Sequence, residues 1–401
     1  MAGASFSKRV MGVEESITVA TTARAGALQR EGVDVISMSS GEPDFDTPQN
    51  IKDAAIRAIH EGHTKYTRPA TGILELKEAI CRKLSRDNGL EYDPTQVVVG
   101  CGAKQTVFDA VVSLIEDGDE AVIPAPFWNS YADQVKLMGG NPVIVQTRAE
   151  DGFRLTPAQL EAAITERTKF LLLNSPCNPS GEVYTRDELS ALGEIVLRAG
   201  IGVISDEVYE KIIYGDSEHV SIASLDPALK EQTLVVNGVS KAYAMTGWRV
   251  GYGAGPADLI SMVGKIQSQE TTHTCSISQH AAAEALDGPQ ESVEMMRRAF
   301  EERRDVIVEG LNAIPGISCR KPRGAFYVFP DVSALIEQSR PSLGIRNDVD
   351  LCNYLLDEAR VAAVPGTGFG TEGHIRIAYA TAMDLIRKAL DRISEAAGKM
   401  A

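Results

Sequence analysis

Lys241 and Arg249 lie eight residues apart in a segment whose composition makes both of them candidates for chemistry. The apolar run at residues 234–236 stops at Asn237-Gly238, which predicts a buried strand that ends in a turn. Lys241 follows among small residues, and apolar surroundings lower the pKa of an amine and make it a nucleophile for Schiff-base chemistry. The guanidinium of Arg249 has the fork geometry that binds a phosphate or a carboxylate. The alternative for each residue is an exposed surface charge.

A glycine-containing turn follows the apolar run at residues 97–99. The turn comprises Gly100, Cys101, Gly102, Ala103 and Lys104, and a helix is predicted from there to residue 114. A strand, a glycine turn and a helix N-terminus together present unpaired backbone amides that bind anions. The turn is not a dinucleotide-binding fingerprint, because Gln105 replaces the third glycine, and the chain contains no GxxxxGK[ST] phosphate-binding loop.

Two further polar side chains follow predicted strands. The strand at residues 202–205 ends at Asp206, and a carboxylate buried there needs a positive partner. The alternative for this aspartate is a helix N-cap. The strand at residues 169–173 leads into a Pro- and Gly-containing loop with Asn178, an amide that turn chemistry alone does not explain. Like the glycine turn and the lysine, both residues come just after apolar strands, where ligands bind in open α/β sheets.

The elements that must position these residues follow an α/β pattern. From residue 96, apolar strands alternate with helices, which predicts a mostly parallel sheet. Strands are predicted at residues 35–38, 97–99, 120–124, 142–146, 169–173, 202–205 and 234–236, and helices at residues 18–29, 51–61, 105–114, 186–199 and 293–311. Later β-type runs at residues 323–329, 361–365 and 374–380 predict a smaller α+β region.

Composition limits the class of protein. The chain has 401 residues, too many for one compact core of ordinary size. A net charge of −15 and a pI near 5.0 argue against a nucleic-acid or anionic-membrane partner. Six cysteines without a C-x-x-C pair predict reduced thiols in the core or near the site, and six scattered histidines predict no metal site. Without an apolar leader or a membrane-length run, we expect a soluble, cytoplasmic protein.

Residues 240–251 read SKAYAMTGWRVG and fit the motif S-K-x-[FY]-x-M-[TP]-G-W-R-[VLI]-G throughout. This segment resembles the class I pyridoxal-phosphate (PLP) aminotransferases, and the chain is most similar to the subgroup Ib aspartate aminotransferases. The resemblance runs in the same order from SSGEPDFDTP at residue 39 to GHIRIAYA at residue 373. It implies PLP-dependent transferase fold type I, with a mostly parallel seven-stranded sheet. A large PLP-binding domain would span residues 46–290, and residues 1–45 and 291–401 would form a smaller α+β domain.

The resemblance also implies which residues surround the cofactor. Lys241 would hold PLP as a Schiff base and move a proton between the substrate and the cofactor. Asp206 would pair with the ring nitrogen, which keeps the ring an electron sink, and Trp128 would stack on the ring. Asn178 and Tyr209 would hold the ring hydroxyl oxygen. The residues implied around the phosphate are Gly102, Ala103, Lys104, Arg249 and, from a partner subunit, Tyr66.

One position departs from the family's pattern. Many relatives carry a phosphate-binding serine three residues before the lysine, whereas this chain has Gly238, and Ser240 is the candidate to replace that contact. Tyr66 lies in a loop with proline and glycine, far in sequence from Lys241, which suits a residue that reaches across a dimer interface. The alternative is that Tyr66 is a packing residue.

Substrate residues follow from the same resemblance. The family's H-x-R-[ILV] motif carries the arginine that binds the substrate α-carboxylate, and it falls on Arg376. The substrate site would also be lined by Gly41, Trp128 and Asn178. For a distal carboxylate, Lys104 and Thr18 match the subgroup Ib residues, since residues 270–275 contain no arginine. The alternatives are that Arg376 is a strand-edge charge and that Lys104 points into water.

The resemblance implies a function. It is the transfer of the amino group of aspartate or glutamate to oxaloacetate or 2-oxoglutarate with PLP as cofactor, in a homodimer with shared active sites. A lysine leaves more room than an arginine fork, so prephenate is a plausible second substrate. Kynurenine-, alanine- and aromatic-type aminotransferases share most of these motifs and are the alternatives. A nucleotide-binding enzyme would need the missing fingerprints, and a silent regulatory relative would normally lack Lys241.

Overall fold

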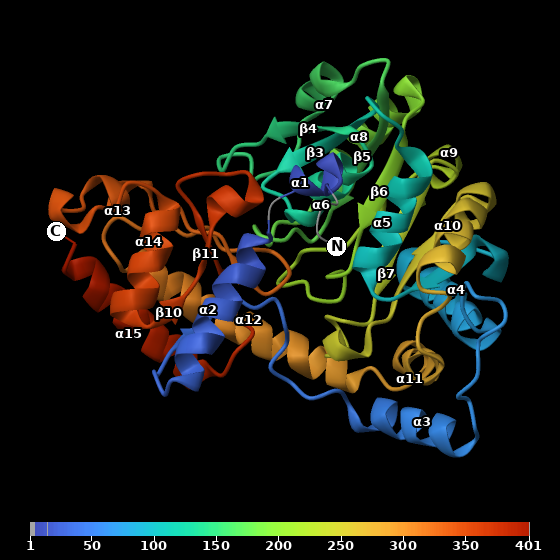
Figure 1. Ribbon diagram of the computed structural model, residues 1–401, viewed down its shortest axis with the longest axis horizontal. Helices are drawn as coiled ribbons and strands as arrows, with labels where there is room; N and C mark the ends of the chain where they lie inside the picture. Colours follow the sequence, from blue (N-terminus) through green and yellow to red (C-terminus); the bar gives the residue numbers. More distant parts are fainter. Residues whose placement is uncertain (1–4, 14, 401) are drawn as a thin grey trace.

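The computed structural model describes residues 5–13 and 15–400, and a seven-stranded sheet forms the middle layer of its larger part (Figure 1). The strands lie in the order β2-β8-β7-β6-β5-β3-β4. Their bounds are β2 (Val97–Gly100), β3 (Glu120–Ala125), β4 (Asn141–Gln146), β5 (Thr168–Asn174), β6 (Gly202–Asp206), β7 (Thr233–Gly238) and β8 (Gly251–Ala254). Six of these strands run in one direction, and β8 runs in the opposite direction between β2 and β7. The predicted α/β fold with a mostly parallel seven-stranded sheet is confirmed.

Helices cover both faces of this sheet, which explains why its strands are near-continuous apolar runs. Alternate residues of β7 face opposite layers: Leu234 and Val236 join one buried cluster and Val235 another. The first face carries α5 (Ala103–Leu114), α6 (Ser130–Leu137) and α10 (Ala257–Glu270). The opposite face carries α4 (Leu74–Asn88), α7 (Pro157–Ala163), α8 (Arg186–Ala199), α9 (Pro227–Lys230) and α11 (Ser276–Asp287), and α3 (Gln49–His60) packs on α11.

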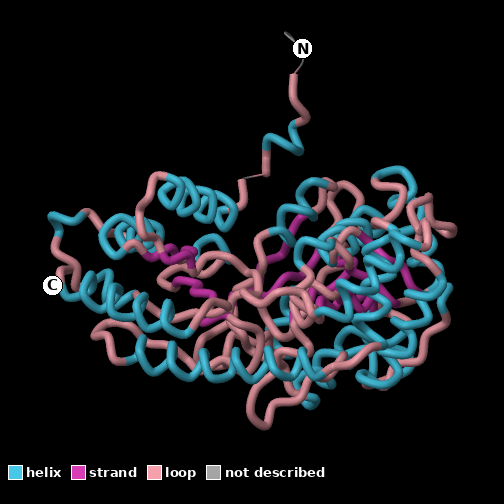
Figure 2. Tube along the Cα trace, turned by 90° about the horizontal axis from the view of Figure 1, so that it is seen from below, coloured by secondary structure: helices cyan, strands magenta, loops and turns pink. Residues whose placement is uncertain are grey.

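A second, smaller group of strands lies to one side of the main sheet (Figure 2). There β1 (Ile36–Ser37) pairs in parallel with β10 (Val361–Ala362), and β11 (Val364–Pro365), β12 (Ile375–Ala378) and β9 (Tyr327–Val328) form an antiparallel sheet. The helices of this part are α2 (Ile17–Arg30), α12 (Glu291–Asn312), α13 (Ser333–Glu337), α14 (Asp348–Tyr354) and α15 (Met383–Gly398).

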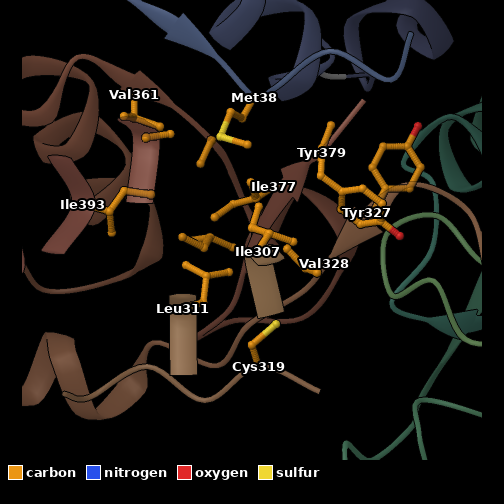
Figure 3. Close-up of a cluster of buried hydrophobic side chains, with 14 of the residues drawn as sticks. Met38, Ile307, Leu311, Cys319, Tyr327, Val328, Val361, Ile377, Tyr379 and Ile393 are labelled. Carbon is orange, nitrogen blue, oxygen red and sulfur yellow. The ribbon is translucent and has the colours of Figure 1, made fainter. Parts of the chain in front are cut away.

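The core of this smaller part joins both ends of the chain. Met38, which follows β1, packs with Ile307 and Leu311 of α12, with Ile377 of β12 and with Ile393 of α15 (Figure 3). The N-terminal segment therefore packs with the C-terminal elements rather than with the sheet that follows it in sequence. The proposed domain boundaries at residues 45 and 290 stay a prediction, and residues 1–4, 14 and 401 of these ranges lie outside the described residues.

The first described element is a short helix that the sequence did not predict, α1 (Lys8–Met11). It lies on a segment that projects from the body of the molecule in Figure 2. Its Arg9 forms an exposed ion pair with Asp117, 2.6 Å between Nη2 and Oδ1. Across residues 5–13 and 15–400, every helix is too short or too polar to span a lipid bilayer.

The carboxyl ends of four strands meet at one edge of the main sheet, because β2, β5, β6 and β7 all run in the same direction. The glycine turn follows β2, the Pro-containing loop with Asn178 follows β5, Asp206 ends β6 and Lys241 comes after β7. This arrangement brings together residues that are more than one hundred positions apart in sequence. It places the candidate site at the sheet edge that the strand pattern predicts.

Candidate active site

A cavity of about 260 Å³ lies at this edge of the sheet, facing the smaller part of the molecule. Eleven of the predicted site residues line it: Thr18, Gly41, Ala103, Lys104, Trp128, Asn178, Asp206, Tyr209, Lys241, Arg249 and Arg376. Lining residues without a predicted cofactor or substrate contact are Tyr131, Asn174, Val208, Thr246 and Tyr327. Residues from both ends of the chain and from the main sheet thus share one site.

The amine of Lys241 is the candidate nucleophile. Its Nζ donates a hydrogen bond to the carbonyl oxygen of Gly41, 2.5 Å away, and lies 5.9 Å from the ring centroid of Tyr209. Burial and, next, the guanidinium of Arg376 lower the pKa of the Lys241 amine to about 8. An amine with this pKa exists in both protonation states near neutral pH, as a group that attacks a carbonyl and carries protons requires.

Gly41 allows its loop to approach the cavity closely. A Cβ at this position would collide with the hydroxyl of Tyr327, so a side chain there requires the loop to move away. The carbonyl of Gly41 would then leave the amine of Lys241 that it now contacts. The small residue at position 41 is therefore part of the geometry of the site.

The carboxylate of Asp206 is buried at the end of β6. Its Oδ2 accepts a hydrogen bond from the hydroxyl of Tyr131, 2.7 Å away, and its Oδ1 accepts one from the backbone N–H of Val208 at 3.2 Å. Burial raises the pKa of Asp206 to about 6, although both hydrogen bonds act to lower it. Residues 208–211 form a turn, so the helix N-cap interpretation is wrong. Asp206 instead presents a buried carboxylate to the cavity.

The glycine turn and Arg249 form a cradle for an anion. Gly102 is the N-cap of α5 with φ at +85°, and a Cβ there would overlap the guanidinium of Arg249. Arg249 donates to the carbonyl oxygens of Thr246 at 2.9 Å and of Cys101 at 3.2 Å, which fixes its guanidinium beside the turn. A positive side chain and the free amides at the start of a helix favour an anion at this point.

Arg376 is buried, with 2% of its surface exposed, so the alternative of a solvent-facing edge charge is wrong. Its Nη1 donates to Oδ1 of Asn178 at 3.0 Å, and its guanidinium lies between the rings of Tyr327 and Phe369, 4.7 and 4.9 Å from their centroids. Burial lowers the pKa of Arg376, but a guanidinium stays charged at neutral pH. Among the described residues no carboxylate pairs with it. A buried cation of this kind is suited to an anionic ligand.

Lys104 and Thr18 lie together with Trp128 around the cavity. The Nζ of Lys104 lies 4.7 Å from the ring centroid of Trp128, although the residue as a whole is exposed. Desolvation and then the charge of Arg249 lower the pKa of the Lys104 amine. The Thr18 hydroxyl oxygen is buried and has no hydrogen-bond partner in the described part of the chain. The alternative that Lys104 points away into water does not fit this contact.

Comparison with known proteins identifies the family. Residues 33–393 match the family model described as aminotransferase class I and II. The chain belongs to this family. Aspartate aminotransferase of Geobacillus stearothermophilus is 49% identical over 388 residues, which cover 97% of this chain and 98% of the relative. Aspartate/prephenate aminotransferase of Cereibacter sphaeroides is 51% identical over 383 residues, or 95% of this chain and 96% of the relative.

A solved structure shows the same fold. The aspartate aminotransferase from Rhizobium meliloti superimposes on this aminotransferase with a TM-score of 0.95 at 46% sequence identity, and the match covers 100% of both chains. The membership that residues 240–251 predict is therefore confirmed, with the family model matching residues 33–393.

Tyr66 of this aminotransferase does not line the cavity of its own chain, as far as the described residues show. Its side chain is 77% exposed, and its ring makes an edge contact with His273 at 5.5 Å between centroids. Gly102 also contributes through its backbone rather than as a lining residue. The role predicted for Tyr66, in the site of a partner subunit, stays a prediction.

Packing against β8 explains why glycine, and not serine, stands at residue 238. A Cβ at this position would lie 3.1 Å from Cα of Gly251 and 3.1 Å from the carbonyl oxygen of Val250, so a serine would press against β8. Ser240, two residues further on, is buried and lines the cavity. The aminotransferase thus has a hydroxyl at the cavity without a side chain at residue 238.

The sequence did not reveal two aromatic residues of the site. Tyr131 contacts Asp206, and the hydroxyls of Tyr327 and Tyr209 lie 2.8 Å apart. Both residues are buried among apolar side chains, and a buried tyrosine on a helix or strand has the same sequence pattern as any core residue. The only available signal was that Tyr131 follows Trp128 by three positions, which is one helical turn.

Two predictions about scattered side chains need correction. Cys275 is exposed, so the expectation that all six free cysteines lie in the core or near the site is wrong for it. The expectation that the six histidines are scattered is wrong for one pair, since the rings of His63 and His280 lie 4.1 Å apart. Pairs of this kind depend on the packing of α11 against α3 and α4 and cannot be read from sequence spacing.

Proposed function

We propose that this chain is an aspartate aminotransferase that moves the amino group of aspartate or glutamate to a 2-oxo acid with pyridoxal 5′-phosphate as cofactor. The observation that carries the proposal is one cavity that holds an amine of lowered pKa, a buried carboxylate and a buried guanidinium: Lys241, Asp206 and Arg376. The two relatives described above carry the names aspartate and aspartate/prephenate aminotransferase.

The residues of the cavity fit this cofactor. Bound PLP supplies an electron sink that stabilises negative charge at the substrate Cα. Asp206 would pair with the ring nitrogen, Trp128 would cover the ring face, and Tyr209 and Asn178 would hold the ring hydroxyl. The phosphate would be held by Arg249, Ser240 and the backbone amides of Gly102, Ala103 and Lys104. The cradle that a Cβ at Gly102 would fill supports the last assignment.

Two residues of this chain would handle protons. Lys241, with a pKa near 8, would take a proton from the substrate Cα and deliver it to the cofactor carbon that receives the amino group, while the carbonyl of Gly41 orients its amine. Asp206, with a pKa near 6, is ionised at neutral pH and keeps a proton on the ring nitrogen. Tyr131 donates to Asp206 and holds the carboxylate in this orientation.

Two cations would select an acidic substrate. The planar fork of Arg376 suits the α-carboxylate, because it offers two parallel donors. Lys104 and the Thr18 hydroxyl would bind the distal carboxylate. A single lysine ammonium fixes less geometry than an arginine fork, so prephenate is our expected second substrate. Kynurenine-, alanine- and aromatic-type transfer are the competing specificities.

A donor panel tests this specificity. With 2-oxoglutarate as acceptor, or oxaloacetate for the glutamate reaction, we expect kcat/KM for aspartate and glutamate to exceed that for alanine, kynurenine and phenylalanine by about tenfold or more. Lys104→Ala should lower kcat/KM for the acidic donors by roughly ten- to a hundredfold and change alanine less than about threefold. Lys265→Ala, an exposed lysine on α10, is the matched control and should change neither. Equal losses of kcat/KM for acidic and neutral donors would show that Lys104 does not bind the distal carboxylate.

We also propose a homodimer in which Tyr66 completes the site of the second copy. Exposed apolar side chains flank Tyr66 in the sequence: Ile56 and Ile59 on α3 and Leu74 at the start of α4. Apolar residues grouped in this way are typical of a surface that another chain covers. The amino-acid and 2-oxo-acid substrates are the small-molecule partners, and the cytoplasmic location stays a prediction.

A further inference from the structure

The turn that follows β6 carries two side chains of the site, Asp206 and Tyr209, yet it belongs to neither a helix nor a strand beyond Asp206. Its backbone hydrogen bonds include those from Glu207 N–H to the Val236 carbonyl, 2.8 Å, and from Glu210 N–H to the Glu207 carbonyl, 2.9 Å. A turn with so few regular bonds depends on side chains to fix its conformation. Those side chains, Glu207 and Glu210, are not among the described residues that line the cavity.

Glu207 is the centre of these contacts. Its side chain is buried; its Oε1 accepts hydrogen bonds from the hydroxyls of Ser205 at 2.8 Å and Ser221 at 2.7 Å. Its Oε2 lies 3.0 Å from Nε2 of His219, which is also largely buried. Asp206, Val208 and Tyr209 line the cavity, whereas Glu207 is not among the described lining residues. The Glu207 carboxylate therefore contacts the turn that carries the site residues and not the cavity itself.

A second buried ion pair joins the same turn to α4. Lys83 contacts Oε1 of Glu210, and Asn88 accepts from Lys83 at 2.7 Å and donates to Oε2 of Glu210 at 2.8 Å. Nε2 of His219 also lies 3.9 Å from Oε2 of Glu210, which is too far for a hydrogen bond. Glu207, Glu210 and His219 are residue types that bind metals, but the ammonium of Lys83 already supplies a cation at this cluster.

We propose that Glu207 and His219 are positioning residues for amino transfer. Held between Ser205, Ser221 and His219, Glu207 fixes the turn so that Asp206 and Tyr209 face the cofactor. The inference rests on the proposed function, because it assigns those two side chains to the cofactor. The inference adds that the placement of Asp206 and Tyr209 depends on Glu207 and His219, which touch neither cofactor nor substrate.

Loss of His219 has a definite consequence. It leaves Oε2 of Glu207 buried without its partner, and a buried carboxylate oxygen without a donor is costly. The turn relieves this cost by moving Glu207 toward water, and the neighbouring Asp206 and Tyr209 move with the backbone. This movement would lengthen two hydrogen bonds of the site. They are the bond from Tyr131 to Asp206, now 2.7 Å, and the bond between the hydroxyls of Tyr209 and Tyr327, now 2.8 Å.

The test compares His219→Ala with the conservative His219→Gln, whose amide N–H can still donate to Glu207. We expect His219→Ala to weaken PLP binding and lower kcat by roughly tenfold or more, and His219→Gln to recover most of both losses. In the full-length protein without PLP, hydrogen exchange should rise in residues 205–212 in His219→Ala and stay unchanged in residues 103–114. Ser221→Ala, which removes one donor to Glu207, should produce a smaller change in the same direction.

Asp348→Asn is the matched control, because Asp348 is a buried carboxylate bonded to Thr367 in the smaller part of the molecule. It should lower Tm without changing PLP affinity. If His219→Ala and Ser221→Ala lower Tm but leave PLP affinity and exchange at residues 205–212 unchanged, the positioning role is wrong. A wild-type protein that does not bind PLP would instead overturn the proposed function, while the exchange data would still decide whether the pair holds the turn.

Discussion

Lys241 and Arg376 show how the cavity prepares single residues for chemistry. Arg376 is buried and Lys241 is partly buried, and the positive charge of Arg376 contributes to the lowered pKa of the Lys241 amine. In the described part of the chain, neither forms an ion pair with a carboxylate. The protein thus keeps two unpaired cations close together, at a cost in stability, and a bound dianionic substrate and a cofactor carrying phosphate would relieve this cost.

This cost predicts a pH effect for the protein without PLP. Below pH 8 Lys241 is charged in the folded and unfolded chains alike, and burial of the charge destabilises the fold. Between pH 8 and 10.5 the folded amine is neutral while the unfolded amine is still protonated, so stability rises with pH in this window. Lys241→Met should therefore be more stable than wild type by about 1–3 kcal/mol at pH 7, with the difference shrinking toward pH 10.5. Urea unfolding at pH 7, 8.5 and 10 measures it, and a difference independent of pH would contradict the lowered pKa.

Arg376→Lys tests the α-carboxylate site. A lysine keeps the positive charge but replaces the two-donor fork with a point charge, and the bond to Asn178 at 3.0 Å loses its geometry. We expect kcat/KM to fall by roughly ten- to a hundredfold or more for every amino-acid donor, acidic or neutral. Steady-state kinetics with aspartate and alanine measure this loss, and a change of less than about threefold would assign the α-carboxylate to another residue.

At the scale of elements, one loop and one helix hold the substrate side of the cavity. Arg303 of α12 donates two hydrogen bonds to the carboxylate of Asp44, 2.6 and 3.0 Å long. Its guanidinium also lies 4.9 Å from the ring centroid of Phe45 and 5.6 Å from that of Phe300. Arg303 is buried, whereas Asp44 is exposed, so water reaches only the carboxylate side of this pair. The pair fastens the loop that carries Gly41 to the long helix that enters the smaller part of the molecule (Figure 1).

Arg303→Met should free this loop while keeping much of the side-chain volume. We expect the KM for aspartate to rise by about tenfold or more and Tm to fall, because breaking a partly buried ion pair leaves Asp44 without its partner. Arg298→Met on the same helix is the control, since its side chain is 71% exposed, and it should have little effect. An unchanged KM in Arg303→Met would show that the loop keeps its position without the ion pair.

The strand ends could be located from the sequence because continuous apolar runs mark buried strands. Parallel strands then bring their carboxyl ends to one edge of the sheet. Lys241, Asp206 and Asn178 could therefore be grouped before their contacts were known. Partners such as Tyr131 and His219 could not be found, because no local pattern states which distant side chain a buried carboxylate meets. The short helix α1 was missed because four residues carry too little periodicity to distinguish a helix from a polar arm.

At the scale of the whole molecule, the cavity lies between two parts of one chain, and a third contributor is expected from a second copy. The main sheet supplies Lys241 and Asp206, whereas the smaller part supplies Arg376, so relative movement of the two parts would change the cavity. Tyr66 is exposed in the single chain. In the proposed dimer this exposure ends when Tyr66 enters the neighbouring site.

Mixed dimers test the shared site. A Tyr66→Phe chain combined with a Lys241→Ala chain forms a hybrid with one site that has both native residues and one site that lacks both. If the site is shared, we expect this hybrid to have about half the activity of the wild-type dimer, well above the mean of the two parent dimers. If each chain completes its own site, the hybrid should retain only half the activity of the Tyr66→Phe dimer. Purified tagged hybrids, assayed beside both parents, separate the two outcomes.

The most direct test of the central claim is chemical mapping of the lysine that carries the cofactor. Borohydride fixes PLP permanently to any lysine to which it is joined, and peptide mass spectrometry then locates the modified residue. The account predicts a protein that absorbs visible light before reduction and carries the label on Lys241 alone, in the peptide that contains residues 240–249. Label on another lysine, or no label at saturating PLP, would contradict it.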